Sequence, residues 1–199
     1  MLSVVIQAGG QSTRMGENKA LKRFLGRPLI QRVMDRLAPV ADELLVTTNH
    51  PEDFSFLDIP LFADIKPGRG ALGGLYTALA SAHHSHVAVV ACDMPFANAP
   101  LLVAAAGLLE HEATDVVIAE TQEGLEPLHA VYRRGTCLPA VGSALEADQW
   151  KVIAWFPKVK VRKLTQEELS RYDPDHLAFW NLNTPEDFSE AERRAAGGA

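Results

Sequence analysis

The sequence predicts an α/β fold of three layers, in which helices cover both faces of a mostly parallel mixed sheet. Short apolar runs alternate with amphipathic segments almost to the end of the chain. This order favours parallel strands joined by helical crossovers. The run HVAVVA at 86–91 is apolar after its histidine, as is typical of a strand at the centre of a parallel sheet.

Strands are expected where short apolar runs end at turn-forming residues. The first run, 2–6, leads directly into a glycine-rich loop, and the run 86–91 gives the clearest strand signal in the chain. The expected strands, in order, are 2–6, 43–47, 60–63, 86–91, 115–119, 129–132, 159–164 and 178–180.

Helices are expected where apolar residues recur at helical spacing. The first is 28–37, in which Pro28 occupies a tolerated first-turn position and Leu29, Val33 and Leu37 share one face. Because no repeat and no low-complexity linker interrupts the pattern, we expect one domain covering 1–199, an ordinary size. The remaining expected helices are 71–82, 100–109, 138–145 and 185–194.

Composition argues against several classes of protein. The chain has 199 residues, of which 47% are hydrophobic, and a net charge of −6 that disfavours binding to duplex nucleic acid. Cys92 and Cys137 lie far apart, which argues against a disulfide framework or a zinc ribbon. No basic leader precedes the first strand, and no apolar stretch reaches the roughly 20 residues that cross a bilayer. We therefore expect a cytoplasmic protein that binds neither nucleic acid nor membrane.

The segment VVIQAGGQSTRMGENKAL, at 4–21, has the components of a phosphate-binding loop in an unusual order. Gly9, Gly10 and Gly16 match neither the G-x-G-x-x-G spacing nor a Walker A loop. Between positions 11 and 32 the chain carries six basic residues and one acid. A solvated basic face is the simpler explanation, but the adjoining glycines favour a positively charged binding site for a polyphosphate.

Three loops are expected to meet at the carboxyl edge of the sheet, where open α/β sheets bind their ligands. They are the glycine loop and the segments at 64–68 and 92–95. Asp64 and Asp93 each leave a strand there. An aspartate in this position either terminates the strand through its own loop or binds Mg²⁺, which takes one or two carboxylates together with substrate phosphates.

Two cations of the glycine loop would accompany these carboxylates. Arg14 grips phosphate through a planar fork, and Lys19 acts as a compact point charge. Cys92 is expected to be a small buried residue rather than a nucleophile, because the neighbouring Asp93 raises the pKa of its thiol.

Five motifs carry a resemblance to a known family: AGGxSxRMGxxK at 8–19, GRPL at 26–29, GALGG at 70–74, CDMP at 92–95 and NLNTPED at 181–187. In this order, and nearly end to end, they resemble the nucleotidyltransferases that include the molybdenum cofactor guanylyltransferases. The resemblance implies a Rossmann-like nucleotidyltransferase fold with Mg²⁺ as cofactor. It also implies GTP and molybdenum-molybdopterin as substrates, with GMP joined to the terminal phosphate of molybdopterin and pyrophosphate released.

The resemblance also implies roles for individual residues. Arg14, Lys19 and Asp93 would be catalytic, with Asp93 binding the metal, while Asn181 and Asn183 would border the reaction centre on the acceptor side. Thr47 or Asn49 would approach the nucleoside, and the residues from Gln7 to Gly10 would contribute backbone groups. The residues implied to line the nucleotide are Gln7, Ala8, Gly9, Gly10, Lys19, Thr47, Asn49, Asp64 and Asp93.

By the same resemblance, residues 1 to about 110 would bind the nucleotide and about 111–199, including 126–129, the acceptor. It leaves room for transient contacts with other molybdenum cofactor biosynthesis proteins. Gln7 stands where the family usually has leucine and Ala71 where it usually has proline. These departures bear on the choice of base more than on the type of reaction. The nearest alternatives are a cytidylyltransferase and a sugar-phosphate nucleotidyltransferase. A nucleotide-binding regulator without turnover is a further alternative, which the presence of Lys19, Asp64 and Asp93 together disfavours.

Overall fold

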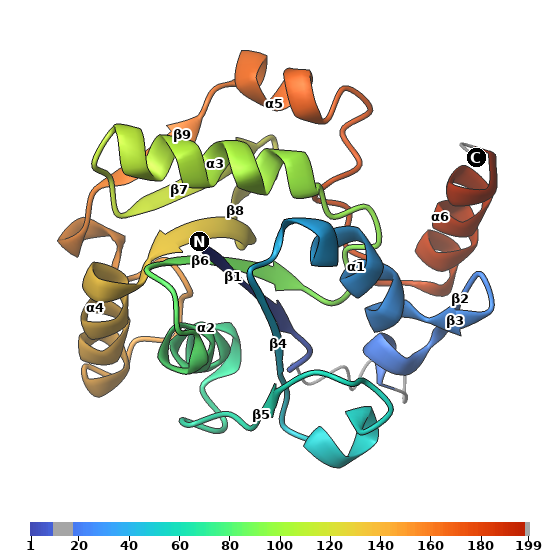
Figure 1. The fold of residues 1–199 in the computed structure, drawn as a ribbon, viewed down its shortest axis with the longest axis horizontal. Coiled ribbons are helices and arrows are strands. Elements are labelled where there is room, and N and C mark those ends of the chain that lie inside the picture. Colours follow the sequence, from blue (N-terminus) through green and yellow to red (C-terminus); the bar gives the residue numbers. More distant parts are fainter. Residues whose placement is uncertain (10–17, 198–199) are drawn as a thin grey trace.

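A seven-stranded sheet forms the centre of the protein, and the computed structural model describes residues 1–9 and 18–197. The strand order across the sheet is β5-β4-β1-β6-β8-β7-β9 (Figure 1). The strands are β1 (Leu2–Gln7), β4 (Glu43–Thr47), β5 (Leu61–Phe62), β6 (His86–Ala91), β7 (Val116–Thr121), β8 (Gly124–Arg133) and β9 (Val161–Leu164).

Most neighbours in this sheet are parallel. Strand β1 pairs in parallel with both β4 and β6, β4 with β5, and β7 with β9, whereas β8 runs antiparallel to β6 and β7. The prediction of a mostly parallel mixed sheet is confirmed, and the run 86–91 lies in the middle of it.

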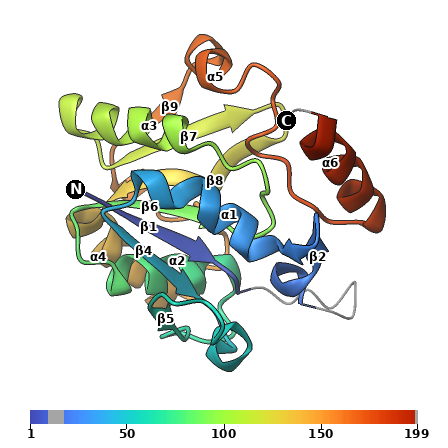
Figure 2. The same ribbon diagram turned by 45° about the vertical axis from the view of Figure 1, so that its right-hand side comes forward.

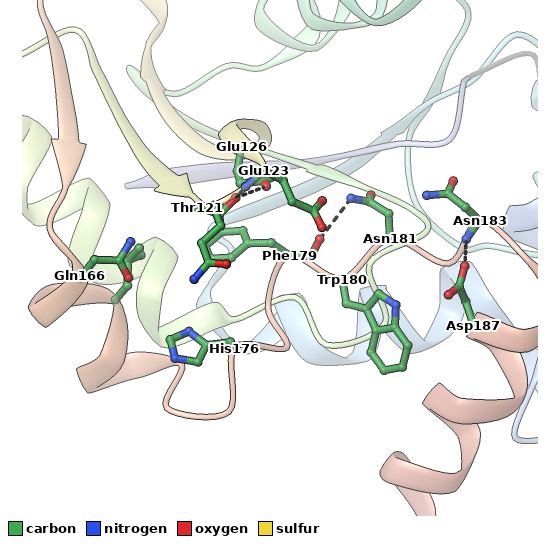
Figure 3. A pocket seen from close by; sticks show the side chains of 12 residues that line it. Thr121, Glu123, Glu126, Gln166, His176, Phe179, Trp180, Asn181, Asn183 and Asp187 are labelled. Atoms are coloured by element: carbon green, nitrogen blue, oxygen red, sulfur yellow. Dashed lines mark hydrogen bonds between the residues drawn. The ribbon is translucent and has the colours of Figure 1, made fainter.

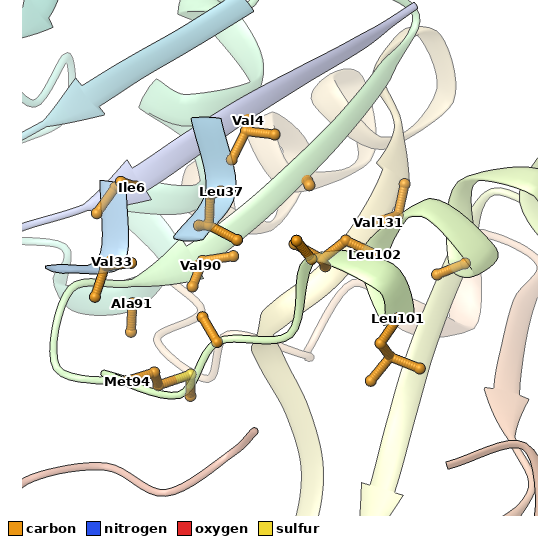
Figure 4. Close-up of a cluster of buried hydrophobic side chains, with 14 of the residues drawn as sticks. Val4, Ile6, Val33, Leu37, Val90, Ala91, Met94, Leu101, Leu102 and Val131 are labelled. Carbon is orange, nitrogen blue, oxygen red and sulfur yellow. The ribbon is translucent and has the colours of Figure 1, made fainter. Parts of the chain in front are cut away.

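Helices cover both faces of the sheet, as predicted (Figure 1). Side chains of successive strand residues alternate between the faces, so Val4 and Ile6 pack with α1 and α3 (Figure 4) while Val5 packs with α2 and α4. The helices that cover the faces are α1 (Leu29–Leu37), α2 (Gly70–Ser81), α3 (Ala99–His111) and α4 (Arg134–Glu146), with 3-10 helices η2 (Ala38–Val40), η3 (Pro51–Phe54) and η4 (Phe156–Lys158) in the connections.

A third, smaller core joins two segments from opposite ends of the chain. Phe24 and Leu29, from the segment after the glycine loop, pack with Leu182 and with Phe188 of the last helix. The backbone N–H of Leu25 donates a hydrogen bond of 2.7 Å to Glu192. Figure 2 shows this helix beside the small hairpin; the elements are η1 (Lys19–Leu21), β2 (Arg23–Phe24), β3 (Arg27–Pro28) and α6 (Pro185–Gly197).

The predicted strand at 178–180 is wrong. Residues there form a turn, because the buried carboxylate of Asp173 accepts hydrogen bonds of 3.0 Å from the backbone N–H groups of both Leu177 and Ala178. Helix α5 (Gln166–Tyr172), just before this turn, was not predicted. Its N-terminus nevertheless has a recognisable sequence pattern, the capping box formed by Thr165 and Glu168.

The other expected elements are present: β4 and β6 have the predicted bounds, and the rest have shifted ends. Helix α4 begins at Arg134 rather than at 138, and β8 begins at Gly124 rather than at 129. The expected division between a nucleotide part and an acceptor part near residue 110 stays a prediction. Among the described helices, none is both long and apolar enough to span a membrane.

His129 on β8 makes the stability of the fold depend on pH. Its ring is buried, its Nε2 accepts a hydrogen bond of 2.9 Å from the backbone N–H of Asn98, and burial lowers its pKa to about 4. As the pH falls below about 6.5, His129 binds a proton in the unfolded chain but stays neutral in the folded chain. The contribution of the neutral ring is therefore fully present above about pH 6.5 and is lost as the pH falls toward 4.

We predict that between pH 7 and pH 5 this histidine lowers the free energy of unfolding by about 2 kcal/mol. Chemical denaturation at the two pH values measures it, and His129→Gln supplies the control because it removes the titrating group. Equal pH dependence in wild type and variant would contradict the prediction.

Candidate functional site

The site lies where three parallel strands end together. Ala8 donates its backbone N–H to the carbonyl of Thr47 (2.8 Å), and Cys92 donates to the carbonyl of Gln7 (3.1 Å), so the ladder continues past the ends of β1, β4 and β6. The residues that follow the ends of these strands lie together at one edge of the sheet, as the sequence predicted.

The first group at this edge consists of Gly9, Asn49 and Asp64. A Cβ atom placed on Gly9 would lie 3.7 Å from Nδ2 of Asn49 and 3.8 Å from Oδ2 of Asp64. Burial raises the pKa of Asp64, while hydrogen bonds with Thr77 and Asn49 act in the opposite direction. Exposed Asn49 and partly buried Asp64 therefore flank a backbone that a ligand can approach closely.

Gln7 and Thr47 lie beneath this edge rather than at it. They are register neighbours in β1 and β4, and their exposed fractions are 4% and 0%. Their side-chain oxygens, Oε1 and Oγ1, are buried without a hydrogen-bond partner among the described residues. The amide of Gln7 fills the space above Gly74 on α2, where any Cβ atom would overlap with it.

The second group joins Asp93, Lys19 and Asn183. Nζ of Lys19 lies 3.7 Å from Oδ2 of Asp93 and donates a hydrogen bond of 2.8 Å to Oδ1 of Asn183. Burial raises the pKa of Asp93, and the charge of Lys19 opposes that shift. A carboxylate and an ammonium group, both largely shielded from solvent, thus stand side by side at the end of β6.

Backbone contacts hold Asn183 in this place. Asp187 on α6 accepts hydrogen bonds from the N–H groups of Asn183 (3.0 Å) and Thr184 (2.8 Å), and Thr184 caps the helix in return. Next to them, the N–H of Leu182 donates to the carbonyl of Asp93 (3.0 Å). The predicted acceptor-side residue Asn183 is therefore brought to Lys19 and Asp93 from the far end of the sequence.

A cavity of about 620 Å³ opens beside this second group (Figure 3). Asn181 and Glu126, both expected on the acceptor side, line it, whereas His129 on β8 is buried and does not reach the cavity surface. Sequence reasoning missed most of the lining, because no spacing links the β7–β8 hairpin to the segment after α5. The lining residues are Thr121, Gln122, Glu123, Glu126, Gln166, Leu169, His176, Phe179, Trp180, Asn181, Asn183 and Asp187.

Two predicted site residues, Gly10 and Arg14, lie outside the described residues. Burial and the charge of Asp93 raise the pKa of the Cys92 thiol far above neutrality, as expected of a residue that is not a nucleophile. Within 1–9 and 18–197, no three His, Cys, Asp or Glu side chains are grouped as a metal site. A divalent ion at Asp93 would need ligands from its substrate, as Mg²⁺ commonly does.

Residues 4–161 match the family described as MobA-like NTP transferase domain. The chain is 36% identical to the molybdenum cofactor guanylyltransferase of Desulfosudis oleivorans, over 98% of this chain and 96% of that one. It is 35% identical to a probable molybdenum cofactor guanylyltransferase of Carboxydothermus hydrogenoformans, over 95% and 94%.

Among solved structures, the fold is similar to that of molybdopterin-guanine dinucleotide biosynthesis protein A from Archaeoglobus fulgidus. The TM-score is 0.86 at 24% identity, with 98% of this chain and 99% of that chain covered. The 4-diphosphocytidyl-2C-methyl-D-erythritol synthase of Anaerococcus prevotii has a TM-score of 0.71 at 13% identity, with 98% of both chains covered. These likenesses show a nucleotidyltransferase fold.

The packing of Gln7 on Gly74 yields a stability prediction. Gly74→Ala forces its new methyl group against the Gln7 amide, and we expect it to destabilise the protein by about 1–3 kcal/mol. In a Gln7→Ala background the space is free, so the same change should be neutral or stabilising, since alanine favours helix by about 1 kcal/mol over glycine.

Gly107→Ala on α3 is the matched control, because a Cβ atom there meets nothing within 4 Å. Denaturant unfolding of the two single variants, the Gln7–Gly74 double variant and the control measures the coupling. Additive effects at Gln7 and Gly74 would show that the two side chains do not compete for one space.

Proposed function

Because the chain belongs to the MobA-like NTP transferase family and is a nucleotidyltransferase, we propose that it transfers GMP from GTP to the terminal phosphate of molybdenum-molybdopterin. Pyrophosphate is released and molybdopterin guanine dinucleotide is formed. The observation that carries the proposal is the contact of Lys19 with both Asp93 and Asn183, next to the Gly9 edge. The names of relatives at 35–36% identity support the donor and the acceptor.

The Gly9 edge takes the nucleoside half of GTP. The backbone of Ala8 and Gly9 allows close approach, and Asn49 and Asp64 supply polar side chains beside it. Lys19, 3.7 Å from the Asp93 carboxylate, contacts the phosphates. Its ammonium group also offsets the negative charge of the GTP phosphates. That charge would otherwise repel the phosphate of the acceptor.

The transfer step joins two phosphates. A terminal phosphate oxygen of the acceptor attacks the α-phosphorus of GTP, and the bond between that phosphorus and the oxygen bridging to the β-phosphate breaks. Asn183 and Asn181 stand on the acceptor side of Lys19 and orient the attacking phosphate. Because both reacting groups are already ionised, the chain needs to position and neutralise them rather than to move protons.

Asp93 is the residue that would hold Mg²⁺. Its carboxylate is a hard oxygen donor, and its distance of 3.7 Å from Lys19 is too long for a hydrogen bond, so a lone pair remains for a metal. Bound there, Mg²⁺ would offset the negative charge of the phosphate oxygens in the transition state.

The Asp93 assignment predicts the behaviour of Asp93→Asn. Asparagine keeps the shape and removes the negative charge, so the variant should melt normally without ligand while GMP transfer falls about a hundredfold or more. Activity measured against Mg²⁺ concentration should recover in part at high Mg²⁺. Exposed Asp53, on η3, gives the control Asp53→Asn, and superimposable curves for Asp93→Asn and wild type would refute the metal role.

Donor choice is tested by a thermal-shift screen with Mg²⁺ and each of GTP, CTP, ATP and UTP. A ligand at about 100 times its dissociation constant stabilises the protein by about 2.7 kcal/mol, and we expect the largest shift with GTP. Equal shifts with CTP and GTP would contradict guanylyl transfer and favour a cytidylyltransferase instead.

A further inference from the structure

The cavity beside Asn183 has two chemically different ends. One end, at Asn183 and Asp187, lies next to Lys19, whose ammonium group donates to Asn183. The other end is formed by the β7–β8 hairpin together with Gln166 and His176 (Figure 3). An acceptor whose phosphate lies at Lys19 would therefore extend its remaining atoms toward the hairpin.

The hairpin end does not suit an anion. The described lining contains neither lysine nor arginine, and two of its three carboxylates, Glu123 and Glu126, belong to the hairpin. The third, Asp187, lies at the other end, where its Oδ2 accepts hydrogen bonds from the backbone N–H groups of Asn183 and Thr184. Like charges in a partly enclosed space repel, so this end fits the uncharged part of the acceptor. The pterin ring of molybdopterin is such a part, and its 2-amino group and N3–H are adjacent hydrogen-bond donors.

Glu126 is placed to accept such donors. Its side chain is half-buried on β8, and within the described residues its carboxylate has one hydrogen-bond partner, the hydroxyl of Thr121 at 3.1 Å. Burial is the main reason that the pKa of Glu126 is raised. A carboxylate that has lost hydration without gaining full hydrogen bonding is stabilised when two N–H groups approach it.

The walls of the cavity fit a flat ring. Phe179 lines it and is fixed from behind by an edge-to-face contact with His129, with ring centroids 5.1 Å apart. Trp180 also lines it and is held against Phe96 at 6.0 Å in a stacked pair. Rigid aromatic walls with a few polar groups are typical of sites for small organic ligands, and the volume of about 620 Å³ is in the usual range.

We propose that Glu126 recognises the amino-lactam edge of the pterin ring and so determines which phosphate-bearing acceptor the enzyme uses. This inference rests on the proposed function. Guanine carries the same donor edge, but the cavity lies beside Asn181 and Asn183, whereas the nucleoside groups Asn49 and Asp64 lie at the Gly9 edge. The pterin is therefore the ring that Glu126 meets.

The test compares Glu126→Gln with wild type. The amide keeps the size and an oxygen for the Thr121 hydroxyl, so the fold is retained, but one acceptor becomes a donor that faces the donors of the pterin. GMP transfer is measured with metal-free molybdopterin varied at saturating GTP, and with GTP varied at saturating molybdopterin. Binding of molybdopterin without GTP is measured separately by fluorescence quenching.

Glu120→Gln is the matched control, because Glu120 is an exposed glutamate of the same hairpin, is paired with Lys163, and lies outside the cavity.

We expect the KM and the Kd for molybdopterin to rise about tenfold or more in Glu126→Gln, with the KM for GTP within about twofold of wild type. Glu120→Gln should leave all three values unchanged. An unchanged KM and Kd for molybdopterin, or a raised KM for GTP alone, would overturn the role of Glu126 while leaving the transfer reaction in place. A wild-type protein that binds molybdopterin through Glu126 but transfers no GMP would instead refute the proposed function.

Discussion

The site depends first on strand β1, which is hydrogen-bonded along its length to parallel neighbours on both sides. Parallel pairing puts the carboxyl ends of all three strands at the same edge, so the residues that come after them are neighbours whatever their distance in sequence. Every residue of β1 is buried, so a slip of one position would exchange the side chains of its two faces. The register of β1 with its two neighbours thus determines how Gly9, Asn49 and Asp93 are placed relative to one another.

The group of Lys19, Asp93 and Asn183 forms where a segment near the N-terminus packs against a segment near the C-terminus. The small core around Phe24 and Phe188 is separate from the two main cores, and it holds the segment of Lys19 against the segment of Asn183. Because Lys19 also contacts Asp93, one ammonium group links its own segment to the end of β6 and to Asn183, just before the last helix. Packing of apolar side chains at a distance therefore sets the geometry of a charged cluster.

Sequence reasoning could find the features that a local pattern determines. HVAVVA predicted the central strand, and Asp93 follows the end of that strand at the carboxyl edge of the sheet, the edge at which Gly9 also lies. It could not separate Thr47 from Asn49, because only the register of β4 shows that one is buried and the other exposed. Nor could it find the cavity, whose walls combine the β7–β8 hairpin with α5 and with the segment that follows the turn at Asp173. Long-range geometry of this kind leaves no periodic signal.

The burial of Gln7 and Thr47 limits which side chains can contact a nucleotide base. A buried polar atom without a partner costs about 1–3 kcal/mol, and both side chains carry one beneath the Gly9 edge. Gln7 is held there by Gly74, whose missing side chain leaves room for the amide. Above this buried layer, the Gly9 backbone lies beside the side chains of Asn49 and Asp64. A leucine at position 7 would fill the same buried layer without an unpaired oxygen, so the glutamine changes the layer beneath the Gly9 edge rather than the surface of that edge.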